Sequence, residues 1–325
     1  MKEEYIGEGT YGCVFKNPKK CDIEISIKNT IVKIFLKKET YDEELINQKQ
    51  IEKIFNKNKN IIVSRISNCE KKLCEYDKEV YNKCTLINND FFISDNQIIY
   101  QIIYEYGGID LIHTIFKTKI KFKNLFKSFK NVFEGLDILS KKQYVHHDVR
   151  LPNILYNTKT KQMKIIDFGF LVNKKDILSN NYNFSFAYNQ SHHNYIPELN
   201  KENFIKFYNH IIHDIIENNY QNVRNKNNIK KLQDIITLMH NMYKSYIKFY
   251  NIEQKFDIKK IDIYMLGVSI LELYTWKIIL NRADINHNKH LIVLNFLTKL
   301  IEINVKKRYN AAKAHKEYMK IIKLI

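Results

Sequence analysis

Glycine and proline, the residues with special backbone conformations, are scarce in this chain of 325 residues, which contains 8 glycines and 3 prolines. Arginine is scarce as well, with only five residues among the 53 lysines and arginines. Lysine is therefore the default cation of the sequence. A glycine, proline or arginine that such a chain retains is expected where only its own geometry will serve. The positions of these few residues are therefore unusually informative.

Long apolar runs are also lacking. The longest, Tyr264–Trp276, has 13 residues and includes Glu272, whereas a helix needs about 20 apolar residues to cross a bilayer. We therefore expect no membrane-spanning segment. Wholesale disorder is not expected either, because 45% of the residues are hydrophobic, which is enough to bury a core. At about 150 residues per domain, the length predicts two domains or one bilobal domain.

The cysteines are few, odd in number and confined to the first part of the chain: Cys13, Cys21, Cys69, Cys74 and Cys84. With no signal peptide ahead of them, this pattern is typical of reduced thiols. It predicts an intracellular, cytoplasmic protein with free thiols. A zinc site is not favoured, because zinc takes four nitrogen or sulfur ligands and the last three thiols have no histidine nearby.

Charge of one sign dominates, since 53 lysines and arginines face 35 acidic residues, for a net charge of +18. A nucleic-acid-binding surface should gather its cations into a patch. Here they are mostly lysines scattered along the chain. The charge therefore indicates a solvated surface, and nucleic acid is an unlikely partner.

The first 105 residues alternate short β-branched runs with turns, which predicts a small antiparallel sheet. Its strands are expected at 11–15, 23–27, 31–35, 91–93 and 98–104. An apolar face behind acidic residues predicts one helix over 41–55. Residues 64–90 show little periodicity and predict a loop or β-ribbon excursion.

After Gly107-Gly108 the apolar period becomes helical. The pattern predicts a buried helix over 125–139, and a second helix over 262–274 that is apolar on nearly all sides. Two further amphipathic stretches predict a helical insertion over 199–261. The fold class is therefore α+β and bilobal, with a sheet and one helix in residues 1–106 and a mainly helical lobe in 107–325.

Three of the eight glycines fall within six residues, in a G-x-G-x-x-G-x-V loop between two strands. The loop consists of Ile6, Gly7, Glu8, Gly9, Thr10, Tyr11, Gly12, Cys13 and Val14. Glycine lets such a backbone close over a polyphosphate and present N–H groups to it. A dinucleotide-binding fold would need a helix straight after the last glycine, and a strand follows here. The loop therefore predicts phosphate binding of another kind.

Lys33 lies inside the apolar run 31–35. A buried ammonium group is costly unless it is paired. Two partners are available. One is a bound phosphate, and the other is a carboxylate of the 41–55 helix, which would form with the lysine the ion pair that positions a nucleotide for phosphoryl transfer. A lysine of an edge strand that reaches water is the open alternative.

A third group of residues combines His147-Asp148 with Arg150 and Asn153, followed fourteen residues later by Asp167-Phe168-Gly169. At these residues the sequence resembles the eukaryotic-type protein kinases, whose H-R-D-x-K-x-x-N catalytic loop and D-F-G motif have these spacings. The resemblance extends from residue 6 to about residue 315. It implies an activation segment over 167–198.

Later landmarks support the same resemblance. Tyr195–Glu198 resembles the A-P-E end of the activation segment, and Asp262–Gly267 resembles the buried helix that anchors the catalytic loop. Arg308 corresponds to the late arginine that pairs with the A-P-E glutamate, here Glu198. Seven of the eight glycines lie at such landmarks or at the hinge: Gly7, Gly9, Gly12, Gly107, Gly108, Gly169 and Gly267.

The resemblance implies roles for individual residues. Asp148 would be the catalytic base, and Asn153 and Asp167 would hold Mg²⁺. Lys33 would contact the α- and β-phosphates of ATP, while Arg150, at the position of the usual lysine, would neutralise the γ-phosphate.

The remaining nucleotide contacts follow from the same comparison. Glu44 is the expected partner of Lys33, with Glu43 as the second candidate. Glu105 and Tyr106 resemble the hinge that binds adenine, with Tyr104 as a bulky gatekeeper and Asp110 near the ribose.

Four features depart from the family pattern. His147 replaces the arginine that reads a phosphate on the activation loop, and Ile31 replaces the small alanine above adenine. Gln48 stands where the helix usually supplies an apolar residue to the regulatory spine. The insertion over 199–261 is longer than usual, and its role is left open between a docking surface and a lineage-specific addition.

The expected function is Mg²⁺-dependent transfer of the ATP γ-phosphoryl group to serine or threonine hydroxyls of protein substrates. Ser191, seven residues before Glu198, is the hydroxyl that Ser/Thr kinases place near the catalytic aspartate. The alternatives are a small-molecule phosphotransferase of the aminoglycoside or choline kinase type, and a pseudokinase that only binds. The Lys, Asn and Ile bias resembles kinases of large DNA viruses, which would place the protein in host cytoplasm or the virion.

Overall fold

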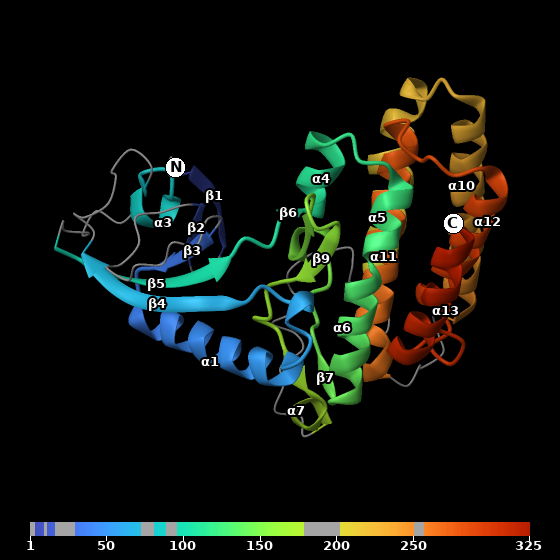
Figure 1. The fold of residues 1–325 in the computed structure, drawn as a ribbon. Coiled ribbons are helices and arrows are strands. Elements are labelled where there is room, and N and C mark those ends of the chain that lie inside the picture. Colours follow the sequence, from blue (N-terminus) through green and yellow to red (C-terminus); the bar gives the residue numbers. More distant parts are fainter. Residues whose placement is uncertain are drawn as a thin grey trace. The chain divides into compact units, whose positions relative to one another are not determined.

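The computed structural model describes residues 4–9, 12–16, 30–72, 81–88, 96–178, 202–249 and 257–325. The chain divides into two compact units, Met1–Gly107 and Gly108–Ile325 (Figure 1). The predicted α+β class, with an antiparallel N-terminal sheet and a mainly helical remainder, is confirmed.

The first unit is built on a five-stranded antiparallel sheet in the order β1-β2-β3-β5-β4. Its strands are β1 (Glu4–Gly9), β2 (Gly12–Lys16), β3 (Thr30–Phe35), β4 (Arg65–Lys72) and β5 (Ile98–Glu105). Helix α1 (Lys38–Phe55) packs against β3 and β5, while a 3-10 turn (Lys59–Ile61) and a short helix α3 (Thr85–Asn88) complete the unit.

Strand alternation gives the sheet two different faces. Phe15, Val32 and Ile34 are buried on one face, where they form a core with Tyr81 and Ile103. Side chains on successive strand residues point to opposite faces. Lys33 therefore lies on the other face, towards α1.

The structure corrects the expectation for residues 64–90, because β4 is a full strand of the sheet rather than an excursion. Its polar side chains conceal it, since β4 is an edge strand whose residues are mostly half-buried or exposed, and a bulge between Arg65 and Ser67 breaks its alternation. The predicted strands 23–27 and 91–93 lie outside the described residues.

The expectation of free thiols was wrong for Cys13 and Cys84, which form a disulfide with a Cα–Cα distance of 6.0 Å. Cys69 is disulfide-bonded as well. The two half-cystines of the first bridge are 71 residues apart in sequence, and packing brings them together. Phe15 is two residues from Cys13 and Tyr81 is three residues from Cys84, and the centres of their rings lie 4.3 Å apart. Counting cysteines cannot reveal such proximity.

The second unit is mainly helical. Its helices are α4 (Leu111–Lys117), α5 (Phe122–Ser128), α6 (Lys130–Lys141), α7 (Lys174–Leu178), α9 (Glu202–Asn209), α10 (Lys226–Phe249), α11 (Ile261–Ile279), α12 (His287–Leu300) and α13 (Ala311–Leu324). A π-helical segment (His210–Ile216) follows α9, and 3-10 turns cover Leu151–Asn153, Glu217–Asn222 and Ile258–Lys260.

Short strands frame the loops of this unit. One small sheet has the order β6-β8-β9, from Ile109–Asp110, Ile154–Asn157 and Gln162–Ile165. A second pairs β7 (Tyr144–Val145) with β10 (Val172–Asn173). The catalytic-loop motif lies between β7 and β8, and the Asp167-Phe168-Gly169 motif lies between β9 and β10.

Helix α11 is the centre of the second unit, and its residues are buried nearly throughout. It contacts α10, α12 and α13, and these helices run alongside it in Figure 1. Gly267 permits the approach of α12, because a Cβ atom there would lie 2.6 Å from Cγ2 of Ile301. Among the described residues no helix has both the length and the apolarity to cross a membrane.

Two helical predictions need comment. The single helix expected over 125–139 is two helices, α5 and α6, separated at Phe129. The described part of the insertion is helical as expected. It packs against the rest of the unit, since Asn228 Nδ2 of α10 donates to the carbonyl oxygen of Ile278 at 3.1 Å and Lys231 Nζ donates to that of Ala283 at 3.1 Å.

Candidate active site

The glycine-rich loop is the hairpin of β1 and β2, in which Gly9 pairs with Gly12. A Cβ atom on Gly12 would lie 2.5 Å from the carbonyl oxygen of Ile34, so only glycine lets β2 approach β3 this closely. The Glu8 carboxylate accepts hydrogen bonds from the backbone N–H and hydroxyl of Thr85, at 2.9 and 2.7 Å. Thr10 and Tyr11 lie outside the described residues.

The register of the sheet separates two neighbouring loop residues. Val14 lies opposite Lys33, and Cys13 lies opposite Ile34. Residues directly opposite in an antiparallel pair share a face. Val14 therefore shares the face of Lys33, whereas the Cys13 side chain points into the core on the other face. Only the backbone of Cys13 would therefore be available to the predicted nucleotide site.

Lys33 pairs with Glu44 of α1, with 3.0 Å between Nζ and Oε2. The lysine side chain is 24% exposed and the glutamate side chain 32%, so the pair is half-buried. The Glu44 carboxylate therefore stabilises the charge of the Lys33 ammonium group. The structure thus provides the carboxylate that a lysine inside an apolar strand requires.

Glu105 of the predicted hinge is held by Ser64, the residue before β4. The N–H of Glu105 donates to the carbonyl oxygen of Ser64 at 3.1 Å, and the Ser64 N–H donates to the Glu105 carboxylate at 2.8 Å. The Glu105 N–H is thereby committed within the sheet. The Tyr106 ring lies 5.1 Å from Nζ of Lys16.

Asp110 belongs to the second unit and begins α4. Its Oδ1 accepts from the N–H of His113 at 2.9 Å, which makes it the N-cap of the helix. The other oxygen, Oδ2, lies 2.5 Å from Nδ1 of the His113 ring, so both oxygens of Asp110 contact His113.

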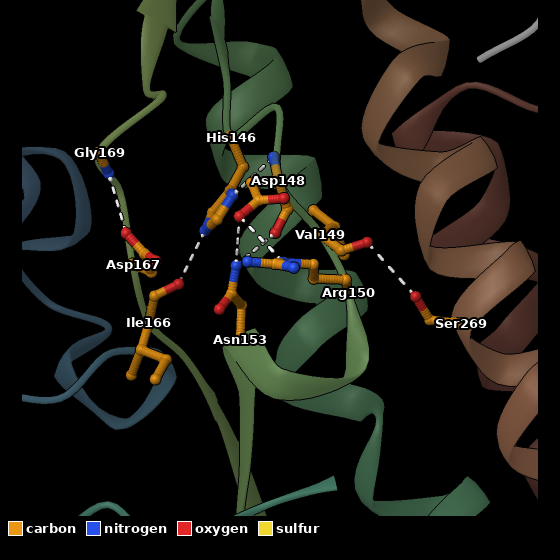
Figure 2. A network of polar contacts seen from close by, with 9 residues as sticks. All are labelled: His146, Asp148, Val149, Arg150, Asn153, Ile166, Asp167, Gly169 and Ser269. Atoms are coloured by element: carbon orange, nitrogen blue, oxygen red, sulfur yellow. Dashed lines mark hydrogen bonds and ion pairs between the residues drawn. The ribbon is translucent and has the colours of Figure 1, made fainter. Parts of the chain in front are cut away.

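The catalytic loop is held in place by hydrogen bonds to side chains of α11. The two carboxylate oxygens of Asp262 accept the N–H groups of His146 and His147, each at 2.9 Å. Burial raises the pKa of Asp262, while the nearby His146 ring and the two N–H groups oppose that effect. Further along, Ser269 Oγ of the same helix donates to the carbonyl oxygen of Val149 at 3.3 Å (Figure 2).

His146 is a member of this network that the motif analysis did not single out. Its Nδ1 accepts from the N–H of Asp148 at 3.3 Å, so Nε2 carries the proton that the carbonyl oxygen of Ile166 accepts at 3.1 Å (Figure 2). Its ring also packs 4.6 Å from that of Phe168. His146 therefore connects the catalytic loop to the D-F-G segment. The only sign of this role in the sequence is its position directly before His147-Asp148.

Asp148 is buried, with 2% of its surface exposed. Its Oδ2 accepts from Nδ2 of Asn153 at 2.6 Å and from Nε of Arg150 at 3.2 Å (Figure 2). Within the described part of the chain, its Oδ1 has no hydrogen-bond partner. One oxygen thus fixes the carboxylate and the other is left to accept a proton.

Asn153 and Asp167 offer oxygen atoms to a cation. Nδ2 of Asn153 donates to Oδ2 of Asp148 and to its carbonyl oxygen, which leaves Oδ1 of Asn153 as the atom to be offered. Asp167 is exposed, with a positive φ of 61°, and its Oδ1 accepts weakly from the N–H of Gly169 at 3.4 Å. Carboxylate and amide oxygens suit Mg²⁺, so this donor set fits the expected metal.

His147 lies in the catalytic loop with a φ of 71° and 1% of its surface exposed. Burial, assisted by the neighbouring His146 ring, lowers the pKa of His147 to about 4. The ring is therefore neutral at neutral pH. It does not supply the positive charge that an arginine at this position would offer to a phosphate.

The end of the activation segment, including Ser191 and Glu198, lies outside the described residues. The Nε of Arg308 donates to the carbonyl oxygen of Glu302 at 2.8 Å, and its guanidinium lies 4.6 Å from the centre of the Tyr264 ring. The expected pairing of Arg308 with Glu198 stays a prediction.

Comparison with known proteins agrees with this geometry. The fold of each unit and the arrangement around Asp148 are those of the protein kinase type. A family model described as protein tyrosine and serine/threonine kinase matches residues 1–203. The chain belongs to this protein kinase family.

Calcium-dependent protein kinase 4 of Plasmodium berghei (strain Anka) is 34% identical to the chain over 82 residues. This similarity covers 24% of the chain and 16% of that relative. The chain therefore matches only a small part of the relative's length.

Proposed function

We propose that this protein kinase transfers the γ-phosphoryl group of Mg²⁺-bound ATP to serine or threonine hydroxyls of protein substrates. The observation that carries the proposal is the Asp148 carboxylate, which is buried and held through Oδ2 while Oδ1 has no partner among the described residues. A carboxylate arranged in this way can orient an acceptor hydroxyl and take its proton.

Each residue has a defined part in the transfer. The acceptor oxygen forms a bond to the γ-phosphorus as the bond from that phosphorus to the β,γ-bridging oxygen breaks, and the acceptor proton moves to Oδ1 of Asp148. Arg150 lies beside this carboxylate and would neutralise charge on the transferred group. Lys33, oriented by Glu44, would contact the α- and β-phosphates.

Magnesium would be held by Asn153 and Asp167. When bound, the ion would offset the negative charge of the phosphates during transfer. Asn153 also fixes Asp148 through its Nδ2 group. One side chain would therefore connect the position of the base with that of the metal.

The preference for serine or threonine is supported by two residues. Arg150, two positions after Asp148, occupies the place of the cation that Ser/Thr kinases use there. Ser191, seven residues before Glu198, stands at the sequence position where Ser/Thr kinases carry a hydroxyl near the catalytic aspartate. The cytoplasmic location and the resemblance to viral kinases stay predictions.

The test is transfer of radiolabelled phosphate from ATP to mixed protein acceptors, followed by phosphoamino-acid analysis. We expect phosphoserine and phosphothreonine, dependence on Mg²⁺, and loss of transfer in Asp148→Asn with ATP binding nearly intact. Asp42→Asn, which changes an exposed acid, is the matched control. Phosphotyrosine as the main product would refute the specificity.

The two alternatives give different results in the same assay. Labelling of choline or an aminoglycoside in place of protein would indicate a small-molecule phosphotransferase. ATP binding without transfer to any acceptor would indicate a pseudokinase.

A further inference from the structure

The gatekeeper side chain and the Lys33–Glu44 pair lie on the same face of the N-terminal sheet. Tyr104 of β5 pairs with Ile31, and Ile102 pairs with Lys33. Ile31 and Lys33 are two positions apart and so share a face, and a residue directly opposite Ile31 lies on that face too. Tyr104 is therefore on the side of the sheet that α1 covers.

The hydroxyl of Tyr104 reaches the carboxylate that holds Lys33. Tyr104 Oη donates to Oε1 of Glu44 at 3.3 Å, while Oε2 of the same glutamate accepts from Lys33 Nζ at 3.0 Å. The two oxygens of Glu44 are thus divided between a neutral donor and a charged one. A carboxylate held through both oxygens has less freedom to rotate than one held through a single contact.

The environment of Tyr104 keeps its hydroxyl available as a donor. The residue is 7% exposed. Burial, together with the charge of Glu44 and the hydrogen bond to it, raises the pKa of Tyr104 well above its usual value. The hydroxyl therefore stays protonated, and a buried hydroxyl requires an acceptor such as the one Glu44 provides.

This contact is one of three along a polar stripe of α1. Glu44, Gln48 and Glu52 are spaced four residues apart and so lie on one face of the helix. Gln48 Nε2 donates to the carbonyl oxygen of Val63 at 3.4 Å, and Oε1 of Glu52 lies 3.6 Å from Nε of Arg65. The stripe fixes the rotation of the helix about its axis, and its first contact adjoins Lys33.

We propose that Tyr104 is a positioning residue for phosphoryl transfer, whose hydroxyl holds the Glu44 carboxylate in the orientation that pairs with Lys33. The proposal rests on the proposed kinase function. It adds a role for the Tyr104 hydroxyl that the size of the side chain alone would not provide. Without the hydroxyl, Glu44 keeps its charge but loses the contact that directs Oε2 to the lysine. Lys33 is then less well oriented towards the phosphates, and transfer slows.

Tyr104→Phe is the test, because it removes the hydroxyl and keeps the ring. We expect kcat to fall roughly threefold to tenfold, the size of effect that loss of one ordinary hydrogen bond produces, because the contact is long at 3.3 Å. The melting temperature should change little. Tyr41→Phe is the matched control, since Tyr41 is 5% exposed and its hydroxyl accepts from Asn68 away from Lys33; its kcat should equal that of the wild type.

A double-mutant cycle separates positioning from packing. If Tyr104 acts through Glu44, the Tyr104→Phe change should have almost no further effect on kcat in a Glu44→Gln background. Equal losses in both backgrounds would overturn the proposal, as would a Tyr104→Phe enzyme with wild-type kcat. Tyr104→Met, which fills the space without a hydroxyl, should reproduce the loss and serves if the phenylalanine variant does not fold.

A second readout needs no protein acceptor. The rate at which an acyl-phosphate derivative of ATP acylates Lys33 should be lower in Tyr104→Phe than in the wild type and unchanged in Tyr41→Phe. A wild-type chain that labels Lys33 but phosphorylates nothing would refute the proposed function alone. Equal labelling of Lys33 in the wild type and Tyr104→Phe would refute the positioning role alone.

Discussion

His147 stands where the kinase pattern has arginine, and this one difference alters the electrostatics of the catalytic loop. Its backbone N–H is fixed by Asp262 at 2.9 Å, and its ring is buried. The loop geometry is therefore held by α11 and does not depend on the identity of the side chain at position 147. What changes is the charge, because a buried imidazole with a pKa of about 4 is neutral where arginine would be cationic.

The lowered pKa of His147 predicts acid sensitivity of the fold. In the unfolded chain the imidazole binds a proton near pH 6.5, whereas in the folded protein it does so only near pH 4. The unfolded state therefore binds more protons between these values, and stability falls as the pH falls through this window. The full difference corresponds to about 3 kcal/mol.

The measurement is urea unfolding of the wild type and of His147→Asn at pH 7 and pH 4.5, since asparagine tolerates a positive φ. The variant should lose less stability on acidification than the wild type. His290 also has a pKa lowered to about 4, so the comparison between the two proteins isolates His147. An identical loss in both would show that the His147 ring is not protected from protons in the folded state.

At the scale of elements, sequence patterns succeeded where burial on one face imposes a period. Strand β3 and helix α1 were visible in this way, whereas β5 and α11, which are buried over most of their surface, were visible as apolar runs. Strand β4 was not, because an edge strand of half-buried polar residues has no apolar alternation to display. Likewise, the break at Phe129 between α5 and α6 does not interrupt the apolar pattern, since residues on both sides of it are buried.

The residues of the candidate site likewise fall into those that local sequence reveals and those that it does not. Motif spacing singled out Asp148, Asn153 and Asp167 as candidates, and the apolar run around Lys33 singled out that lysine, because both patterns lie in the local sequence. It could not identify His146 as the link to Ile166, nor the Tyr104 hydroxyl as a partner of Glu44, 60 residues away. Such contacts depend on packing between distant segments.

The bridge between β2 and the segment that begins α3 predicts a large stability effect. A crosslink between residues 71 apart stabilises by about 4 kcal/mol in the chain-entropy model. We expect Cys13→Ser/Cys84→Ser to unfold at lower denaturant concentration by this amount under non-reducing conditions. Each single variant should match the double variant, and finding two free thiols at these positions in the purified wild type would contradict the assignment.

At the scale of the whole molecule, the second unit completes its core with segments beyond the family match, which ends at residue 203. Helix α10 packs against α11 and α12. Tyr274 of α11 and Asp234 of α10 both contact the buried His290 of α12, at 2.7 Å from its Nδ1 and 3.2 Å from its Nε2. The described part of the insertion is therefore integrated into the unit through both apolar and polar contacts.

This integration predicts that α10 stabilises the fold and is not a detachable addition. Leu232 is fully buried on the face of α10 that meets the core, whereas Ile247, near the end of the same helix, is 56% exposed. Leu232→Ala should lower the free energy of unfolding by about 2 to 5 kcal/mol, because it removes buried methyl groups and leaves a cavity. Ile247→Ala should change it by no more than about 0.5 kcal/mol. Chemical denaturation of both variants decides the matter. If Leu232→Ala were as stable as the wild type, α10 would be an appendage on a core that is complete without it, and the surface beneath it would be free to serve another purpose.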